Sequence, residues 1–269
     1  MTHTPIDSNT AHGAVPALPG SPAALPPHRP LPAYYANEAE HRSFLQRIFD
    51  DTAVDYDRIE SVLALGSGSW YRRQALLRAG LKAGMQVLDV GCGTGLLARE
   101  ALTLVGAGGS LTGVDPSPGM MAEARRALPT ATFVEGRAES LPVPAASADF
   151  LAMGYALRHI DDVQVTFADF RRALRPGGRL LVLEITRPES ALGRLLLKVY
   201  MRAFVPLMAW ALARRDSTPR LFRYYWDTIE ACIKPPEVLA ALERAGFVDV
   251  RRDVVLGIFS EYTATAPAR

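Results

Sequence analysis

Three closely spaced glycines, followed by an aspartate, form the part of the sequence with the clearest chemical meaning. The segment Met85-Gln-Val-Leu-Asp-Val-Gly-Cys-Gly-Thr-Gly95 begins as a short apolar run and ends in a turn without Cβ atoms at Gly91, Gly93 and Gly95. A ligand can approach bare backbone there, and the free amides of a helix that starts at the turn can bind a carboxylate. Asp115 ends the next apolar run, 20 residues after Gly95, where its carboxylate can accept both hydroxyls of a ribose. The pattern therefore predicts a nucleoside cofactor with a carboxylate, namely S-adenosylmethionine.

A nicotinamide dinucleotide is the competing ligand for such a turn. The dinucleotide pattern G-x-G-x-x-G needs a glycine at position 96, where this chain has Leu96. Gly91-Cys-Gly93-Thr-Gly95 is instead the tighter G-x-G-x-G form, which favours methyl transfer over hydride transfer. A glycine turn that binds nothing is the structural alternative, and the presence of Asp115 at the right distance argues against it.

A regular alternation of strands and helices positions the turn. Short apolar runs predict strands, and apolar residues at helical spacing predict helices. The predicted strands are 85–90, 111–115, 132–135, 149–153, 179–185, 247–252 and 254–260. The predicted helices are 41–65 and 71–79 before the first strand, then 95–105, 118–128, 162–174 and 238–245. This order predicts a doubly wound α/β domain with a mostly parallel sheet and helices on both faces.

Composition excludes several classes of protein. The 269 residues are 49% hydrophobic, which is enough for one substantial core. A net charge of +2 gives no reason to expect nucleic acid as a partner. The two cysteines, Cys92 and Cys232, lack metal-ligand or redox spacing, so we expect no metal site and a reducing cytoplasm. No uninterrupted apolar stretch reaches about 18 residues, so we expect no membrane span.

The chain divides into a tail and one domain. Residues 1–33 are rich in Pro, Ala, Ser and Thr and do not resemble a secretory signal, so we expect a disordered tail. Residues 34–269 then form the domain, in which residues 34–80 are expected to make lid helices over the core.

A long apolar insertion, residues 190–226, interrupts the alternation. Between Glu189 and Asp216 it carries no acidic residue but five basic ones: Arg194, Lys198, Arg202, Arg214 and Arg215. Such a segment could cover a hydrophobic substrate, or make a peripheral contact with an anionic membrane surface through residues 190–215. An ordinary capping helix packed on the domain is the third interpretation.

Six segments together resemble one family. They are Phe49-Asp-Asp-Thr-Ala-Val-Asp-Tyr-Asp57, Leu88-Asp-Val-Gly-Cys-Gly-Thr-Gly95, Ala138-Glu-Ser-Leu-Pro142, Leu157-Arg158, Leu174-Arg-Pro-Gly-Gly-Arg-Leu-Leu-Val-Leu-Glu184 and Arg223-Tyr-Tyr-Trp-Asp-Thr-Ile229. From about residue 47 to about residue 257 the chain resembles the ubiquinone/menaquinone biosynthesis C-methyltransferase family. The resemblance implies a Rossmann-like class I methyltransferase fold with a seven-stranded sheet. It also implies S-adenosylmethionine as cofactor and a ring carbon of a prenylated quinol precursor as methyl acceptor.

The expected cofactor contacts come from the motif and from the resemblance. The motif itself contributes Asp89, Gly91, Gly93 and Gly95. The resemblance matches further cofactor positions to Thr94, Asp115, Arg137, Ala138 and Gly154. Residues 135–138 follow the third predicted strand, where this class of fold usually holds adenine, and Gly154 follows the fourth, beside the transferring methyl.

Arg158, His159 and Tyr155 are the candidate catalytic residues. Methylation of a ring carbon needs a deprotonated or strongly hydrogen-bonded ring hydroxyl, and no metal is required. Arg158 can stabilise an oxyanion and orient the ring, His159 can accept a proton, and Tyr155 can stack on an aromatic acceptor. The structural alternatives are a surface or capping arginine, a structural histidine and a core tyrosine.

The sequence departs from the family at two places near these residues. Ala156-Leu-Arg-His159 stands where the family has Gly-Leu-Arg-Asn, and Gly257-Ile-Phe-Ser-Glu-Tyr-Thr263 replaces a histidine-glycine-lysine signature. Two other functions therefore stay open: methylation of another hydrophobic small molecule, such as a polyketide or phenolic lipid, and a non-catalytic cofactor-binding subunit of a biosynthetic complex. We expect a cytoplasmic protein, with peripheral contact at the inner membrane face as an open alternative. The oligomeric state is not predicted.

Overall fold

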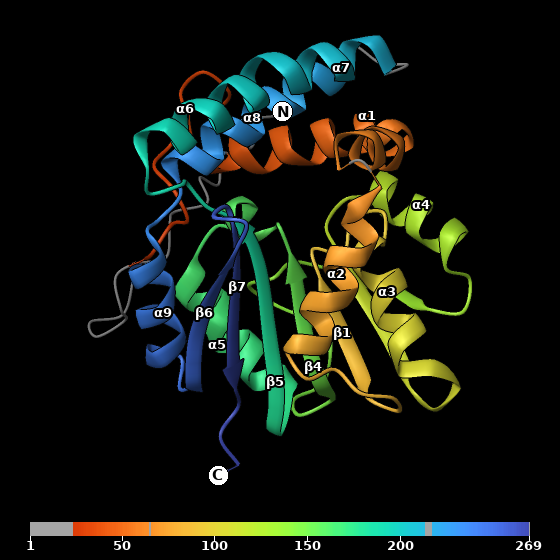
Figure 1. Cartoon of the computed structure of the whole chain (residues 1–269). Helices are drawn as coiled ribbons and strands as arrows, with labels where there is room; N and C mark the ends of the chain where they lie inside the picture. Colours follow the sequence, from red (N-terminus) through yellow and green to blue (C-terminus); the bar gives the residue numbers. More distant parts are fainter. Residues whose placement is uncertain (1–23, 65, 213–216, 269) are drawn as a thin grey trace, which may run out of the picture.

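A seven-stranded sheet forms the centre of the molecule in the computed structural model, which describes residues 24–64, 66–212 and 217–268 (Figure 1). Its strands are β1 (Gln86–Val90), β2 (Ser110–Asp115), β3 (Thr132–Glu135), β4 (Ala148–Gly154), β5 (Leu174–Ile185), β6 (Val248–Val255) and β7 (Phe259–Thr265). Their order across the sheet is β3-β2-β1-β4-β5-β7-β6. Only β7 runs antiparallel to its neighbours β5 and β6, which confirms the predicted mostly parallel sheet.

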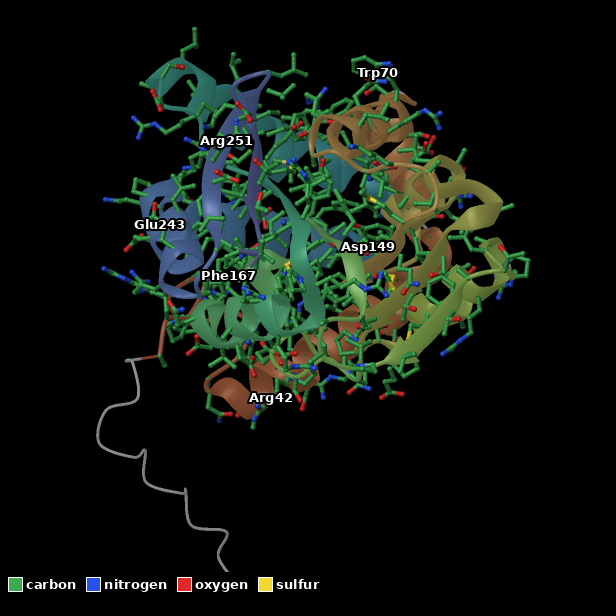
Figure 2. The ribbon with its side chains drawn as sticks, turned by 90° about the horizontal axis from the view of Figure 1, so that it is seen from below. Arg42, Trp70, Asp149, Phe167, Glu243 and Arg251 are labelled. Atoms are coloured by element: carbon green, nitrogen blue, oxygen red, sulfur yellow. The ribbon has the colours of Figure 1, made fainter. Side chains whose placement is uncertain are left out.

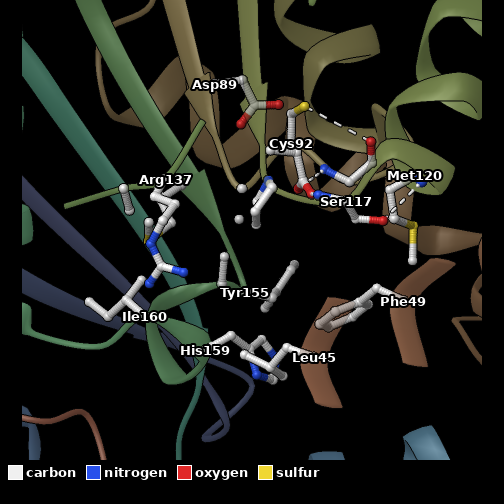
Figure 3. Close-up of a pocket in the computed structure, with 18 of the residues that line it drawn as sticks. Leu45, Phe49, Asp89, Cys92, Ser117, Met120, Arg137, Tyr155, His159 and Ile160 are labelled. Atoms are coloured by element: carbon white, nitrogen blue, oxygen red, sulfur yellow. Dashed lines mark hydrogen bonds between the residues drawn. The ribbon is translucent and has the colours of Figure 1, made fainter. Parts of the chain in front are cut away.

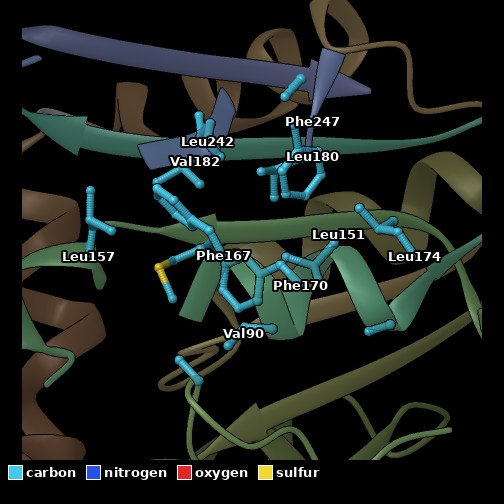
Figure 4. Packing of buried hydrophobic residues seen from close by; sticks show 14 of the residues in the cluster. Val90, Leu151, Leu157, Phe167, Phe170, Leu174, Leu180, Val182, Leu242 and Phe247 are labelled. Atoms are coloured by element: carbon cyan, nitrogen blue, oxygen red, sulfur yellow. The ribbon is translucent and has the colours of Figure 1, made fainter. Parts of the chain in front are cut away.

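Helices cover both faces of this sheet, as predicted. α2 (Ser67–Arg78), α3 (Leu96–Val105) and α4 (Pro118–Ala127) pack on one face. α5 (Val163–Ala173) and α9 (Pro235–Arg244) pack on the other. In Figure 4, Phe167 and Phe170 of α5 lie against the sheet residues Leu151, Leu180 and Val182, all of them fully buried. The strands are buried on both faces, which explains why they appear in the sequence as continuous apolar runs.

A helical cap lies across one end of the sheet. It consists of α1 (Glu38–Leu63), α6 (Ala191–Val199), the π-helical segment η3 (Tyr200–Phe204), α7 (Val205–Leu212) and α8 (Ser217–Ala231). The cap has a hydrophobic core of its own, in which Phe44 and Ile59 of α1 meet Leu221, Tyr224 and Trp226 of α8. In Figure 1, α8 lies between the α6–α7 run and α1. Part of the insertion therefore packs as an ordinary capping layer.

Local signals fix the starts of two helices that border the site. Ser117 precedes α4, and its hydroxyl oxygen accepts a hydrogen bond from the amide of Met120 at 3.1 Å. Pro118 occupies the first helical position. Asp162 precedes α5 and accepts the amides of Gln164 and Val165. These caps hold the loops after β2 and β4 in place at the carboxyl edge of the sheet.

The structure corrects several boundaries that the sequence predicts. The two helices before the core begin three or four residues earlier than expected and end one or two residues earlier, with α1 spanning Glu38–Leu63 and α2 spanning Ser67–Arg78. The last two strands were expected at 247–252 and 254–260, whereas β6 continues to Val255 and β7 runs from Phe259 to Thr265. Alternating apolar residues continue through both strands and their turn, so their periodicity alone does not locate the turn.

The expected tail is also corrected, at its C-terminal end. Residues 24–33 pack on the domain: the amide of Leu25 donates to Asp162, and the carbonyl of Pro27 accepts the amide of Ile233. His28 is buried and forms a β-bridge with Cys232. Proline-rich composition does not prevent packing where neighbouring backbone groups supply the hydrogen bonds. The remainder of the expected tail, residues 1–23, lies outside the described residues.

Candidate active site

A cavity lies at the carboxyl ends of β1, β2, β3 and β4, under the cap (Figure 3). β1 lies between β2 and β4 in the sheet, so the cavity stands at the point where the strand order reverses, the usual ligand position in open α/β sheets. α1 contributes Leu45, Phe49 and Tyr56 to its wall, and α8 contributes Tyr225. The cavity has about 1320 Å³ of empty space, part of it continuous with solvent.

Most of the site residues predicted from the sequence meet at this cavity. Eight expected cofactor residues and two expected catalytic residues line it: Asp89, Gly91, Gly93, Thr94, Asp115, Arg137, Ala138, Gly154, Tyr155 and His159. Gly95 and Arg158 are the exceptions. Gly95 stands just outside, directly before α3, and takes φ 88°.

The glycine turn and Asp115 form one hydrogen-bonded unit. The amide of Gly93 donates to Asp115 Oδ2 at 2.8 Å, and the amide of Ser117 donates to Oδ1 at 2.9 Å. Gly91 takes φ 66°, and a Cβ atom there would lie 2.5 Å from the Cβ of Ala156, so only glycine fits this close approach of two loops. Burial raises the pKa of Asp115 to about 6. Each carboxylate oxygen can accept a second donor, so both remain able to bind ribose hydroxyls.

Asp89 stands at one end of the cavity with an unusual carboxylate (Figure 3). Its side chain is buried, and neither oxygen has a hydrogen-bond partner among the described residues. Burial, and then the charge of Asp115, raise its pKa to about 8. A buried carboxylate without donors is costly unless a ligand supplies them. The ammonium group of S-adenosylmethionine is such a donor.

The loop after β3 forms another wall, where Arg137 and Ala138 were expected to contact the cofactor. Both line the cavity, Ala138 as a buried residue. Arg137 Nη2 lies 2.6 Å from Asp161 Oδ2, and the same oxygen lies 3.2 Å from Arg42 Nη1 of α1. Asp161 thus joins the cap to the loop that the sequence assigns to adenine.

At the opposite end from Asp89 the wall becomes aromatic (Figure 3). His159 stacks on Tyr224 at 5.6 Å between ring centroids and meets Phe49 edge-on at 5.4 Å. The Tyr225 hydroxyl donates to the Tyr56 hydroxyl at 3.3 Å. Tyr155, which follows Gly154, takes φ 61°, a left-handed conformation that is strained for a bulky residue. The end of the cavity beyond Gly154 is therefore shaped for a flat apolar molecule.

The surroundings of His159 keep its imidazole neutral. Burial and then the nearby charge of Arg158 lower its pKa well below the ordinary 6.5. Neither ring nitrogen has a hydrogen-bond partner in the described part of the chain. A neutral imidazole can accept a hydrogen bond through its unprotonated ring nitrogen at neutral pH, whereas the low pKa of His159 disfavours transfer of a proton to it.

Arg158 lies behind the cavity wall. Its Nη1 donates to Glu184 Oε1 and to the carbonyl of Tyr155, and the exposed fractions of the two paired side chains are 3% and 1%. Its guanidinium also lies over the ring of Tyr225, 4.7 Å from the centroid. Arg158 therefore links the strained Tyr155, the strand β5 and the cap helix α8, and the expectation that it contacts the acceptor directly does not match this geometry.

Sequence reasoning missed the residues by which α1 closes over the site. Asp50 Oδ1 accepts from the Ser117 hydroxyl at 2.6 Å and from the Gly119 amide at 2.8 Å. Asp57 Oδ1 accepts from the Thr94 hydroxyl at 2.5 Å. The seven-residue spacing of Asp50 and Asp57 on one helix face was the available signal.

The fold and the cavity together define a class I, S-adenosylmethionine-dependent methyltransferase. A solved S-adenosylmethionine-dependent methyltransferase from Aquifex aeolicus superposes with a TM-score of 0.56 at 19% identity, covering 78% of this chain and 97% of that chain. At this identity the likeness concerns the fold alone.

The chain belongs to the ubiE/COQ5 methyltransferase family, whose model matches residues 36–265. The ubiquinone/menaquinone biosynthesis C-methyltransferase UbiE of Hahella chejuensis is 31% identical over 213 residues, which cover 77% of this chain and 84% of the relative. The demethylmenaquinone methyltransferase of Beutenbergia cavernae is 33% identical over 218 residues, which cover 81% of this chain and 88% of the relative. The expected family is thereby confirmed, and S-adenosylmethionine is the cofactor.

The residues present fit this cofactor. Asp115 can take the ribose hydroxyls, the unpartnered Asp89 can take the ammonium group, and the glycine turn leaves room for the methionine chain against its backbone. No group of three or more metal-ligating side chains occurs within the described residues.

Proposed function

We propose that this protein methylates a ring carbon of a prenylated quinol precursor in ubiquinone or menaquinone biosynthesis. The observation that carries the proposal is the aromatic end of the cavity, where Phe49, His159 and Tyr225 stand beyond Gly154, on the side expected for the transferring methyl. A flat quinol ring fits such a wall, and the names of the relatives add quinone biosynthesis as the pathway.

When bound, S-adenosylmethionine supplies the methyl group as an electrophile. The chain then has two tasks, to align the ring carbon and to assist its hydroxyl. Phe49 and Tyr225 hold the ring against the aromatic wall of the cavity. His159, kept neutral by burial and by Arg158, accepts a hydrogen bond from the ring hydroxyl, which increases the electron density on the ring carbon and makes it more nucleophilic.

Arg158 acts in this proposal as a positioning residue. Its contacts with the Tyr155 carbonyl and the Tyr225 ring fix two walls of the acceptor end. The ion pair with Glu184 holds Arg158 behind the cavity wall, and from there its positive charge lowers the pKa of His159 without direct contact with the acceptor. Tyr155, held in its strained conformation, borders the reacting ring.

A prenylated acceptor resides in a membrane, so the proposal includes a peripheral membrane contact through residues 190–215. No helix in the described residues is long and apolar enough to cross a membrane. Residues 213–215 of that segment lie outside the described residues, and α6, η3 and α7 make up most of the remainder.

The decisive experiment is mass spectrometry of the lipid quinone pool in cells with and without the gene. We expect a demethylated quinone precursor to accumulate in the deletion strain, and wild-type protein but not Asp115→Ala to restore the methylated quinone. An unchanged quinone pool would favour another hydrophobic acceptor. Restoration by both Asp115→Ala and His159→Phe would favour a non-catalytic subunit, because cofactor binding and the hydrogen bond to the acceptor would then be dispensable.

A further inference from the structure

The helical run of α6, η3 and α7 carries two separate apolar stripes. The inner stripe consists of Leu197, Met201 and Val205, which recur every four residues and pack into the core of the cap. One such stripe is enough to attach a surface helix to its domain. The second stripe therefore has no role in holding the helix to the protein.

This second stripe, here called the outer face, consists of large apolar side chains that remain exposed. Its members are Leu192, Leu195, Leu196, Val199, Leu207 and Trp210. The exposed fractions are 67% for Leu192 and 70% for Trp210 at its two ends. Scattered exposed apolar residues are normal, but a contiguous row along 19 residues of one helical run marks an interaction surface.

A basic stripe borders the outer face. Arg194, Lys198 and Arg202 follow one another at intervals of four residues, and all three are exposed. Because no acidic residue occurs between Glu189 and Asp216, nothing in this segment of sequence neutralises them. An apolar face beside a basic stripe is the pattern of helices that lie in the interface of an anionic bilayer.

We propose that the outer face docks on an anionic lipid bilayer, with α6 and α7 lying parallel to the membrane plane. Leu195, Val199 and Trp210 enter the boundary between headgroups and acyl chains, and the basic stripe contacts lipid phosphates. A second copy of the chain fits this surface less well, because a two-fold contact through one helix face brings like basic stripes close together.

The docking surface has a structural connection to the cavity, and this part of the inference rests on the proposed function. α8 packs against α7 on one side and α1 on the other, and it places Tyr225 in the cavity wall. The bilayer would therefore lie one helix layer away from the acceptor end. A prenylated ring could pass between membrane and cavity without crossing bulk water.

Vesicle binding tests the docking surface without using turnover. The chain has three tryptophans, of which Trp226 is buried while Trp70 and Trp210 are 65% and 70% exposed. In full-length protein carrying Trp70→Phe, we expect phosphatidylcholine/phosphatidylglycerol vesicles to shift the Trp210 emission to shorter wavelength. Pure phosphatidylcholine vesicles should bind at least tenfold more weakly, since each basic residue near an anionic surface contributes about fivefold in affinity.

Matched variants locate the contact. Lys198→Glu with Arg202→Glu should weaken flotation with anionic vesicles by more than about tenfold, whereas Arg251→Glu on β6 should change it less than about twofold. Trp210→Ser should weaken binding, and Trp70→Ser should not. Trp70 on α2 and Arg251 on β6, both labelled in Figure 2, are exposed, lie outside the α6–α7 run and serve as controls.

Three results would overturn the proposal: no binding to either vesicle, equal binding to neutral and anionic vesicles, or a dimer that dissociates in Trp210→Ser. The last result would mean that a second copy covers the outer face. Methylation of a water-soluble short-chain quinol distinguishes the two proposals, because Trp210→Ser should leave it unchanged. Intact vesicle binding without turnover of any quinol would refute the proposed function alone.

Discussion

Asp89 stands one residue before the end of β1 and Asp115 ends the neighbouring parallel strand β2, and their two buried carboxylates interact electrostatically at the floor of the cofactor site. Asp89 pairs in register with Gly113, two residues before Asp115. The two carboxyls differ in their partners: Asp115 accepts two backbone amides, whereas neither oxygen of Asp89 has a partner of good hydrogen-bond geometry among the described residues, although the Ala98 amide lies close enough to lower its pKa. Burial together with Asp115 therefore raises the pKa of Asp89 to about 8, against about 6 for Asp115. The pair prepares the site for a ligand that carries both hydroxyls and positive charge.

Binding of S-adenosylmethionine should release a proton from Asp89. At pH 7 the free protein holds this carboxyl largely protonated, and the cationic ligand favours its ionised form. We expect affinity to fall as pH decreases from 8.5 to 6, and calorimetry in buffers of different ionisation enthalpy to detect the proton. Asp89→Asn should abolish the release, and a release that persists in this variant would contradict the assignment.

The same residue should make the ligand-free protein less stable at alkaline pH. The folded-state pKa of Asp89 lies above its ordinary value of 3.8, so between these values the folded protein binds more protons than the unfolded chain. Its stability therefore falls as pH rises through this window. Asp89→Asn should raise the free energy of unfolding at pH 8 by about 1–3 kcal/mol in urea titrations, with a smaller gain at pH 5.

Asp115→Ala should weaken S-adenosylmethionine binding by about 1–3 kcal/mol, because the ribose hydroxyls and the Gly93 and Ser117 amides lose their acceptor. Asp253→Ala, a change at an exposed site on β6, is the control and should leave affinity unaltered. Isothermal calorimetry measures both. Equal affinity for the two variants would remove Asp115 from the cofactor site.

Gly119→Ala should loosen the contact between α1 and the core. A Cβ atom there would lie 2.8 Å from the Cα of Asp50, a backbone atom that can move only if α1 moves. We expect a loss of stability of about 1–3 kcal/mol and faster release of S-adenosylmethionine in stopped-flow measurements. Gly108→Ala is the matched control, since its Cβ would meet no atom closer than 3.7 Å. Identical release rates for both variants would show that α1 does not retain the cofactor.

His159→Phe should lower kcat on a quinol acceptor by about a hundredfold while cofactor affinity stays within about twofold, because the aromatic wall remains and only the acceptor nitrogen is lost. His159→Asn keeps a hydrogen-bond acceptor and should retain more activity than His159→Phe. The low pKa of His159 also predicts no inflection in kcat near pH 6.5 in the wild type. Equal kcat for His159→Phe and the wild type would exclude a role for His159 as hydrogen-bond acceptor.

Arg158→Ala should destabilise the protein by about 3–5 kcal/mol, because it leaves the Glu184 carboxylate buried and unpaired. The double variant Arg158→Met with Glu184→Gln should recover most of this loss in urea titrations. We expect the double variant to bind S-adenosylmethionine normally but to show a raised KM for the quinol, since Tyr225 loses the guanidinium above its ring. A double variant with both wild-type KM and wild-type stability would show that the Arg158–Glu184 pair has only a structural role.

The order of elements followed from the sequence because it depends on neighbours along the chain. The strand–turn–helix of Gln86–Val105 could be predicted from apolar runs, three glycines and helical spacing. Asp115 and residues 135–138 could also be assigned to the cofactor site from the sequence, since the carboxyl ends of parallel strands meet at one edge of a sheet. Strand ends were less certain, as the shifted turn between β6 and β7 illustrates.

The contacts of charged residues could not be predicted from spacing. Arg158 meets Glu184, 26 residues away, and Asp57 meets Thr94, 37 residues away. Nothing local distinguishes these carboxylates from others that face solvent. These contacts form only when α1 packs over the glycine turn and when β5 pairs with β4. The second of these contacts gives Arg158 a positioning role instead of the expected direct one.

By itself the sequence determined the α/β core and the cofactor cradle, because strand period, glycine turn and strand end are encoded within short segments. Tertiary structure alone decided which of the two apolar stripes of α6 and α7 packs inward, since both have helical spacing. It also decided that His159 is enclosed by Phe49, Tyr224 and Tyr225. Burial and desolvation arise only when distant segments meet, and they set the chemistry of the acceptor end.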